Sequence, residues 1–431
     1  MTATPAGHRA SGAQPGKIGG HAPATLSCFS LPVPGISARS FSAIARPLCG
    51  KPPSMINWSQ KLLRPASAAL FAAGLAAAFL HRPVTEPSAF APPSAPASPA
   101  RQQAEMSLAM LPVAAPVAGP SSLARLADGR IAAAWLAGPS NDASAAGIWL
   151  SVLGQNGWSQ PLLAATREST AAGTFAHLHS LGRPLLLAEG SWLHLWYESL
   201  PLGHWAGAAI VHSLSTDGGK TWSKAERLPT SALGALGSGL GGPPLMLADG
   251  GLALPLDQRF PTQGSEWLRL SATGRIVDKI RLAHPAATQQ AAILALDEQR
   301  ALAIFRDKRA GTSRATLSTA NGGQTWGAAG ELALPGPDAP VALLRLASGH
   351  LLLAGNPQAG KETLQLWLSA DDGQNGVMKR SVEAASDGGA EFADPALLQA
   401  RDGRIHLTYT WRRQGIRHAV FTEAWLAGDA P

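Results

Sequence analysis

The feature that most restricts the fold of this sequence is a short unit that recurs six times after residue 120. Each copy contains an apolar stretch, a turn that usually includes glycine, and a second apolar stretch. The copies begin at Leu126, Leu187, Leu247, Leu296, Leu346 and Ala400, with 49 to 61 residues between successive starts. Asp-Gly or a similar turn between two short apolar runs predicts a β-hairpin.

A second unit recurs in the same phase as the first. Ser215 to Trp222 reads Ser-Thr-Asp-Gly-Gly-Lys-Thr-Trp, Thr319 to Trp326 reads Thr-Ala-Asn-Gly-Gly-Gln-Thr-Trp, and Ser369 to Gly373 is a shortened copy. Each repeat therefore offers two hairpins, which is four strands, the content of one propeller blade. The sequence predicts an all-β fold, a six-bladed β-propeller over residues 119–426.

The N-terminal part of the chain has a different composition. Residues 1–54 form a basic arm without acids, which is either part of the protein or a start assigned too early, since Met55 offers a second start. Residues 66–80 are uncharged and apolar and follow Lys61 and Arg64, so 55–82 are expected to form a signal peptide or a signal-anchor helix. Residues 83–118 are rich in Ala, Pro and Ser and are expected to be a linker.

The charge and cysteine distributions exclude several functions. The formal net charge of +7 arises in the arm, because seven of the 35 Lys and Arg residues precede residue 65 and no Asp or Glu does. The rest of the chain is balanced, which argues against nucleic acid as a partner. Both cysteines, Cys28 and Cys49, lie in the arm, and no Cys or His group has metal-ligand spacing. We expect no cofactor and no metal.

The second recurring unit resembles the Asp-box, or BNR repeat, of the sialidases (neuraminidases). In that family the Asp-box is a structural turn on the face away from the site, and the resemblance gives this role to Ser215, Asp217, Gly219, Trp222, Asn321, Gly323 and Trp326. The last repeat, with Glu391 to Gln399 and Arg401 to Arg413, is similar to the closing blade of bacterial exo-alpha-sialidase-like proteins. The resemblance covers about residues 120–422 and implies a sialidase-like propeller.

In such a propeller, the start of each innermost strand and the end of the next strand meet on one face. The predicted ligand-binding residues on this face are Arg259, Gln290, Arg306, Asn356, Lys361, Arg412 and Arg413. Cations gathered at one mouth suit an anionic glycan or glycoconjugate, because guanidinium groups bind carboxylates through two hydrogen bonds. The alternative is a solvated rim whose charges pair with each other, for instance Arg306 with Asp307 and Arg259 with Asp257.

The catalytic residues of sialidases carry over only in part. Arg306 matches one of the three arginines that bind the substrate carboxylate, and Lys361 stands near the place of another. The expected Tyr nucleophile is replaced by Phe392 and its Glu partner by Gln290, so the standard Tyr-based mechanism is not expected. The carboxylates left as candidate acids and bases are Asp142, Asp257, Asp307, Glu391 and Asp394.

Three functions remain open on this basis. The first is a divergent exo-glycosidase acting on a sialic-acid-like or uronic glycan, and the second is a glycan-binding propeller without turnover that handles cell-surface polysaccharide. The third is a scaffold for a protein partner. We expect the propeller to lie outside the cytoplasm, periplasmic or secreted, with residues 66–80 as the only membrane contact if they stay uncleaved as an inner-membrane anchor.

Overall fold

The computed structural model describes residues 58–80, 89–91, 103–140, 142–201, 204–230, 237–260, 263–282, 288–307, 313–334, 336–357, 361–386 and 389–428. The chain divides into two compact units, Met1–Arg82 and Pro83–Pro431. In the first unit, α1 (Trp58–Leu80) is a helix of 23 residues that contains Pro65. No described helix combines the length and apolar character needed to span a membrane. The basic arm, 1–54, lies outside the described residues.

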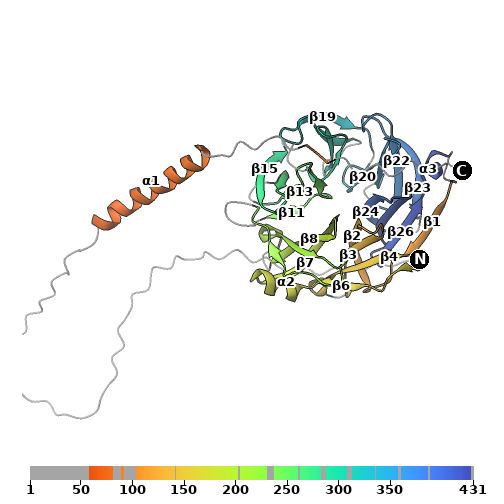
Figure 1. The fold of residues 1–431 in the computed structure, drawn as a ribbon, viewed down its shortest axis with the longest axis horizontal. Coiled ribbons are helices and arrows are strands. Elements are labelled where there is room, and N and C mark those ends of the chain that lie inside the picture. The colour runs from red at the N-terminus through yellow and green to blue at the C-terminus, as the bar shows by residue number, and fades with distance from the viewer. Residues whose placement is uncertain are drawn as a thin grey trace, which may run out of the picture. The chain divides into compact units, whose positions relative to one another are not determined.

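In the second unit, the strands among the described residues form six antiparallel sheets around a central axis (Figure 1), which confirms the predicted six-bladed propeller. The first three blades are β2 (Val117–Arg125), β3 (Ile131–Gly138), β4 (Gly147–Gly154), β5 (Gly157–Trp158) and β6 (Leu162–Ala165); β7 (Leu178–Glu189), β8 (Trp192–Pro201), β9 (Ala209–Ser215) and β10 (Glu226–Arg227); and β11 (Ser238–Leu240), β12 (Leu245–Met246), β13 (Leu252–Gln258), β14 (Gly264–Leu270) and β15 (Ile276–Leu282). Short helices η1 (Ala143–Ala145), α2 (Arg167–Thr174) and η2 (His204–Gly207) lie in the connections.

The other three blades follow the same order of strands. They are β16 (Thr288–Ala295), β17 (Ala301–Asp307), β18 (Arg314–Thr319) and β19 (Gly327–Leu332); β20 (Ala342–Arg345), β21 (Leu351–Gly355), β22 (Thr363–Ser369) and β23 (Val377–Ala384); and β24 (Phe392–Gln399), β25 (Ile405–Trp411), β26 (Gly415–Phe421) and β1 (Met106–Met110). The first strand of each blade lies nearest the axis, where β2 contacts both β7 and β24. Helix α3 (Glu423–Ala427) follows the last blade.

The recurring turns join the first and second strands of the blades. In the turn between β2 and β3, the Gly129 N–H donates to the Leu126 carbonyl at 2.9 Å, and the Leu126 N–H donates to the Arg130 carbonyl at 2.8 Å. Gly129 has φ +89°, a conformation that glycine adopts without steric cost. The same pair of bonds closes the turns at Leu247, Leu346 and Ala400, so these copies of the repeat share one turn geometry.

The core consists of apolar clusters between neighbouring blades. Along β3, Ile131, Ala133 and Trp135 pack toward the last blade, whereas Ala132 and Ala134 pack toward the second. Successive strand residues point to opposite faces of a sheet, and here both faces are covered. The strands are therefore nearly continuous apolar runs such as Ile-Ala-Ala-Ala-Trp-Leu-Ala-Gly.

The last blade takes its outer strand from the N-terminal side of the propeller. Strand β1 pairs with β26, with Met106 opposite Phe421 and Met110 opposite Arg417. The Thr422 hydroxyl donates to the carbonyl of Gln103 at 2.8 Å. The predicted boundary of the linker, 83–118, is therefore wrong at its C-terminal side, because residues 106–110 belong to the last blade.

Residues 89–91 also belong to the propeller. Phe90 is fully buried and meets the Trp267 ring edge-on at 6.1 Å between centroids. Its N–H donates to the Glu298 carbonyl at 2.7 Å, and the Ala91 N–H donates to the Met246 carbonyl at 3.0 Å. An aromatic side chain thus anchors this part of the predicted linker between the third and fourth blades.

The Asp-boxes lie between the third and fourth strands, at the end of the propeller that also carries the Asp-Gly turns. The Asp217 carboxylate accepts hydrogen bonds from the Lys220 and Thr221 N–H groups, both at 3.0 Å, and from the Thr221 hydroxyl at 2.7 Å. These bonds hold the pKa of Asp217 far below its usual range, and the bond from the Thr221 hydroxyl has the largest effect. Asn321 and Asp371 close the corresponding turns in the fourth and fifth blades.

Candidate functional site

The candidate site is formed around β-bulges in four of the innermost strands. In β2, β7, β16 and β24 the pairing register shifts near the start of the strand, so two residues face one on the partner. The shifts bring Arg183, Gln290 and Asp394 out of the regular alternation. Gln290 and Asp394 also have φ of 49° and 51°, a left-handed conformation that costs an ordinary residue about 1–2 kcal/mol. Strained polar residues at one place are typical of binding and catalytic sites.

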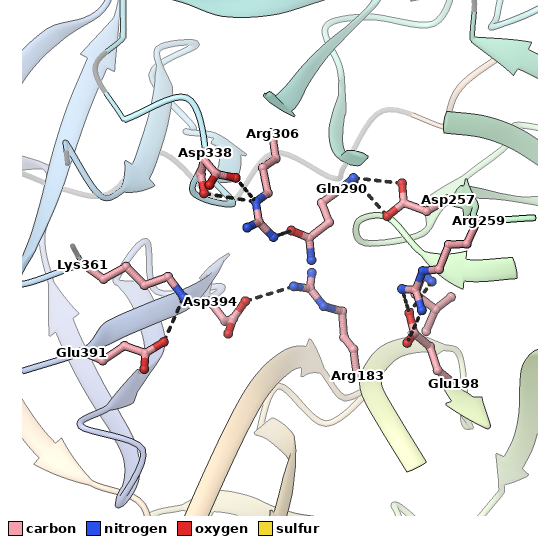
Figure 2. A network of polar contacts seen from close by, with 11 residues as sticks. Arg183, Glu198, Asp257, Arg259, Gln290, Arg306, Asp338, Lys361, Glu391 and Asp394 are labelled. Atoms are coloured by element: carbon pink, nitrogen blue, oxygen red, sulfur yellow. Dashed lines mark hydrogen bonds and ion pairs between the residues drawn. The ribbon is translucent and has the colours of Figure 1, made fainter. Parts of the chain in front are cut away.

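Polar contacts link the blades in a ring on this face (Figure 2), which we call the polar ring. Its pairs are Glu198 with Arg259 at 2.7 Å, Asp257 with the Gln290 N–H at 2.9 Å, Arg306 with Asp338 at 2.9 Å, Lys361 with Glu391 at 2.9 Å, and Asp394 with Arg183 at 3.0 Å. The first four pairs each join consecutive blades, and the last joins the sixth to the second. Blade one contributes Gly119 and Pro120 at its register shift instead of a charged residue.

Two guanidinium groups face the axis in the middle of the ring. Figure 2 shows Arg183 and Arg306 entering from opposite sides and approaching the Gln290 side chain. Arg306 Nη1 donates to Gln290 Oε1 at 3.0 Å, while its Nε donates to Asp338. Arg183, Gln290 and Asp394 line a cavity of about 80 Å³ together with residues from all six blades. Both arginines are about one-fifth exposed (17% and 25%), so they are held in place and still reach solvent.

Three of the predicted acids, Asp257, Asp307 and Glu391, are buried or bound to cations. Burial raises the pKa of Asp257 to about 6 even though the Gln290 N–H opposes the shift, and the carboxylate is only 1% exposed. Asp307 is buried as well. Burial also raises the pKa of Glu391, but hydrogen bonds from Arg413 and Lys361 outweigh this and hold it below its usual range. Neither Asp257 nor Glu391 is placed to donate a proton to a ligand at neutral pH.

Asp142 and Asp394 complete the set of predicted acids. Asp142 is exposed and accepts from the Ser144 hydroxyl at 2.5 Å, which with the Ser144 N–H lowers its pKa. Its bonds stay within its own loop, and no described contact ties it to the polar ring. Asp394 is the predicted acid that lies at the axis, paired with Arg183.

Asn356 has a structural role in place of the predicted binding role. It is fully buried, and its Nδ2 donates to the carbonyls of Thr363 and Phe392, both at 2.7 Å. It therefore fastens the fifth blade to the sixth. Arg413 reaches Glu391 and its side chain is 70% exposed, while the Arg412 guanidinium lies 5.4 Å from the Trp411 ring centroid.

Arg183, Glu198 and Asp338 are expected on this face from the propeller topology, since Arg183 and Asp338 precede innermost strands and Glu198 stands late in a second strand, and the structure brings all three into the polar ring. Arg183 stands between Gly182 and Pro184 within an apolar run, and Asp394 precedes Pro395 in the same way. Glycine and proline inside a strand indicate a bulge. Those signals were sufficient to place Arg183 at the axis. Glu198 lies within regular strand β8, and its place toward the end of a second strand is the signal that puts it on this face.

The described residues contain no group of three or more His, Cys, Asp or Glu side chains placed to hold a metal ion. The ring instead offers guanidinium, ammonium and amide donors around a small axial cavity. Such donors recognise carboxylates and hydroxyl groups. A six-bladed propeller with this polar face and with Asp-boxes on the opposite one defines the class of sialidase-like propellers.

Comparisons with known proteins agree with this class. The BNR repeat-like domain family matches residues 129–407, and the chain belongs to this family. Similar solved structures include the Hadza microbial sialidase Hz136 (TM-score 0.59, 15% identity, 72% of this chain and 66% of that one) and the NanB sialidase from Streptococcus pneumoniae (0.57, 13%, 73% and 70%). A third is the Trypanosoma rangeli sialidase (0.55, 14%, 72% and 56%). No curated protein sequence matched. At these identities the likeness shows the fold, and the chain spans 66% of the length of the microbial sialidase.

Proposed function

We propose that this protein binds an anionic glycan at the polar ring and does not hydrolyse it. The observation that carries the proposal is the pair of axial guanidinium groups, Arg183 and Arg306, each anchored by one carboxylate. Arg183 uses only Nη2 in its bond to Asp394, and Arg306 uses Nε and Nη1. The remaining N–H groups are donors for a carboxylate or for sugar hydroxyls.

The proposal favours binding over turnover because of the state of the carboxylates. Glycoside hydrolysis by carboxylates needs one acid of raised pKa at the sugar and a second carboxylate on the other side of the bond. In the described part of the site, Asp257 is buried beneath the Gln290 backbone, and Glu391, Asp394 and Glu198 are each bound by a cation. Phe392 and Gln290 supply neither a hydroxyl nor a general base.

The test is a glycan array carrying sialylated and uronic-acid sugars, probed with the full chain. Arg306→Gln and Arg183→Gln should reduce binding at least tenfold, because each removes a charge-assisted contact. Arg130→Gln is the matched control, since Arg130 is half exposed and pairs with Asp128 at the opposite end of the propeller. Mass spectrometry of the bound sugars should show no released product.

Two outcomes would contradict the proposal. Release of a terminal sugar would establish a divergent glycosidase, and the Asp394→Asn variant would then show whether the axial acid takes part. If the wild-type protein binds none of the glycans, the polar ring serves to join the blades, and a protein partner becomes the favoured ligand.

We further propose that the propeller works outside the cytoplasm. The support is the order of a basic stretch without acids followed by the apolar part of α1. Protease accessibility in intact cells, combined with mass spectrometry of the mature N-terminus, tests location and cleavage together. Protection of the propeller in intact cells with a permeable outer envelope would overturn this proposal.

A further inference from the structure

The axial channel has a second, much larger cavity at the end opposite the polar ring. It measures about 660 Å³ and lies among the C-terminal ends of the innermost strands. Each blade contributes an apolar side chain, namely Leu123, Leu186, Met246, Leu294, Leu344 and Leu397. Leu123 and Leu397 also line the small polar cavity, so one layer of side chains separates the two ends.

The walls of this cavity suit an apolar ligand. Met246, Leu294, Leu344 and Leu397 line the cavity and remain partly exposed. Covering such a surface is favourable by about 25 cal/mol per Å². The volume falls in the range of about 300–1,000 Å³ that is typical of small-molecule sites, which combine apolar walls with a few polar groups.

The charged residues that line this cavity are Arg125, Arg345 and Asp297, and Asp297 pairs with Arg300 at 2.6 Å. Arg345 reaches Asp372 at 3.5 Å, and the same carboxylate also receives Arg300 at 3.2 Å. Arg125, at the end of β2, is half-buried and lines the cavity, and among the described residues its guanidinium has no acid or acceptor. A half-buried guanidinium beside an apolar cavity favours a ligand with an acidic group.

We infer that this cavity binds a fatty acid, with the hydrocarbon chain among the axial leucines and the carboxylate on Arg125. The charge at the mouth selects the head group, and the apolar wall selects the chain. The site is separate from the polar ring and does not depend on glycan binding.

The test uses the full chain and measures displacement of the fluorescent fatty acid cis-parinaric acid by dodecanoate and by dodecanol. Dodecanoate should displace the probe from one saturable site per chain. Arg125→Gln should weaken dodecanoate binding about tenfold, the loss of one charge-assisted contact, and should leave dodecanol binding unchanged. Leu294→Trp, which fills the cavity, should abolish both.

Arg130→Gln is the matched control for Arg125→Gln, because it removes an arginine that does not line the cavity. Arg306→Gln should leave dodecanoate binding unchanged, which separates this inference from the proposed glycan site. Absence of saturable displacement from the wild-type protein would overturn the inference. So would equal affinity for dodecanoate in the wild type and in Arg125→Gln.

Discussion

Arg183 of the second blade donates to Asp394 of the sixth blade at 3.0 Å, across the inner edge of the first blade. This bond closes the polar ring where blade one offers only Gly119 and Pro120. The two side chains are 17% and 23% exposed, so water screens the pair only in part. One contact therefore combines two roles, joining distant blades and orienting a guanidinium at the axis.

The first prediction concerns the strength of this ion pair. A double-mutant cycle with Arg183→Met and Asp394→Asn should give a coupling energy of about 1–2 kcal/mol in denaturant unfolding. Asn is the suitable replacement because it tolerates the left-handed conformation that Asp394 adopts. The exposed pair of Arg130 and Asp128, about half exposed on both sides, should give no more than about 0.5 kcal/mol. Equal coupling in the two cycles would contradict the partial burial of the axial pair.

The second prediction concerns the anchor at Phe90. Phe90→Ala should lower the free energy of unfolding by about 3–5 kcal/mol, because the ring is fully buried against Trp267. Phe260→Ala is the control, since Phe260 is 48% exposed and its loss should change stability by less than about 0.5 kcal/mol. Guanidinium unfolding followed by tryptophan fluorescence measures both. Similar losses would mean that residues 89–91 do not pack on the propeller.

The six blades could be predicted from the sequence because their signals are local. Each Asp-Gly turn specifies its own hairpin, and the repeat spacing counts the blades. Strand β1 could not be found in this way, since it lies in an Ala- and Pro-rich stretch and its neighbour Glu105 bonds to Thr422, 317 positions away. The pairing of β1 with β26, near the other end of the chain, leaves no periodic signal within β1 itself.

The site could be predicted only as a set of residues on one face. The sequence suggested pairs between neighbours, Arg306 with Asp307 and Arg259 with Asp257. Consecutive strand residues point to opposite faces, so Arg306 and Asp307 diverge, while Arg259 lies beyond the end of β13 and bonds to Glu198. The structure pairs Arg306 with Asp338 and Arg259 with Glu198, from adjacent blades. Partners of this kind depend on bulges and on the packing of one blade against the next, which the spacing of residues does not specify.

The third prediction compares the two glycines of the first Asp-box. Both have positive φ, +74° at Gly218 and +92° at Gly219. A Cβ on Gly218 meets nothing within 4 Å, whereas a Cβ on Gly219 lies 2.6 Å from Leu150 Cδ2 in the preceding blade. Gly218→Ala should therefore cost about 1 kcal/mol from backbone strain, and Gly219→Ala about 2–4 kcal/mol from strain and overpacking together. Thermal and denaturant unfolding check this order, and a larger loss at Gly218 would refute the packing of the Asp-box against the first blade.

The fourth prediction starts from a buried pair of histidines in the last blade. Trp158 Nε1 donates to His418 Nδ1 at 3.1 Å, so the neutral His418 ring carries its proton on Nε2 and donates to His406 Nδ1 at 2.9 Å. Burial lowers the pKa of His406 to about 4. Burial, and then the neighbouring His406, lowers the pKa of His418 to about 3. Protonation of Nδ1 in either ring would break the bond that this atom accepts.

His406 and His418 contribute to the pH dependence of stability. Below about pH 6.5, the pKa of an unfolded histidine, the unfolded chain binds protons that the folded state does not bind. The contribution of the two histidines to the free energy of unfolding is therefore complete above about pH 6.5 and falls as the pH drops toward 4. The loss is about 2 kcal/mol per histidine at pH 5. Asp257, with its pKa raised to about 6, acts in the opposite sense, since its contribution falls as the pH rises from 4 to 6. His406→Gln keeps an acceptor for His418 and removes one titrating group. Denaturant unfolding should therefore show that the free energy of unfolding falls by about 2 kcal/mol less in the variant than in the wild type between pH 7.5 and pH 5. An equal fall in both proteins would exclude this buried pair as a source of acid sensitivity.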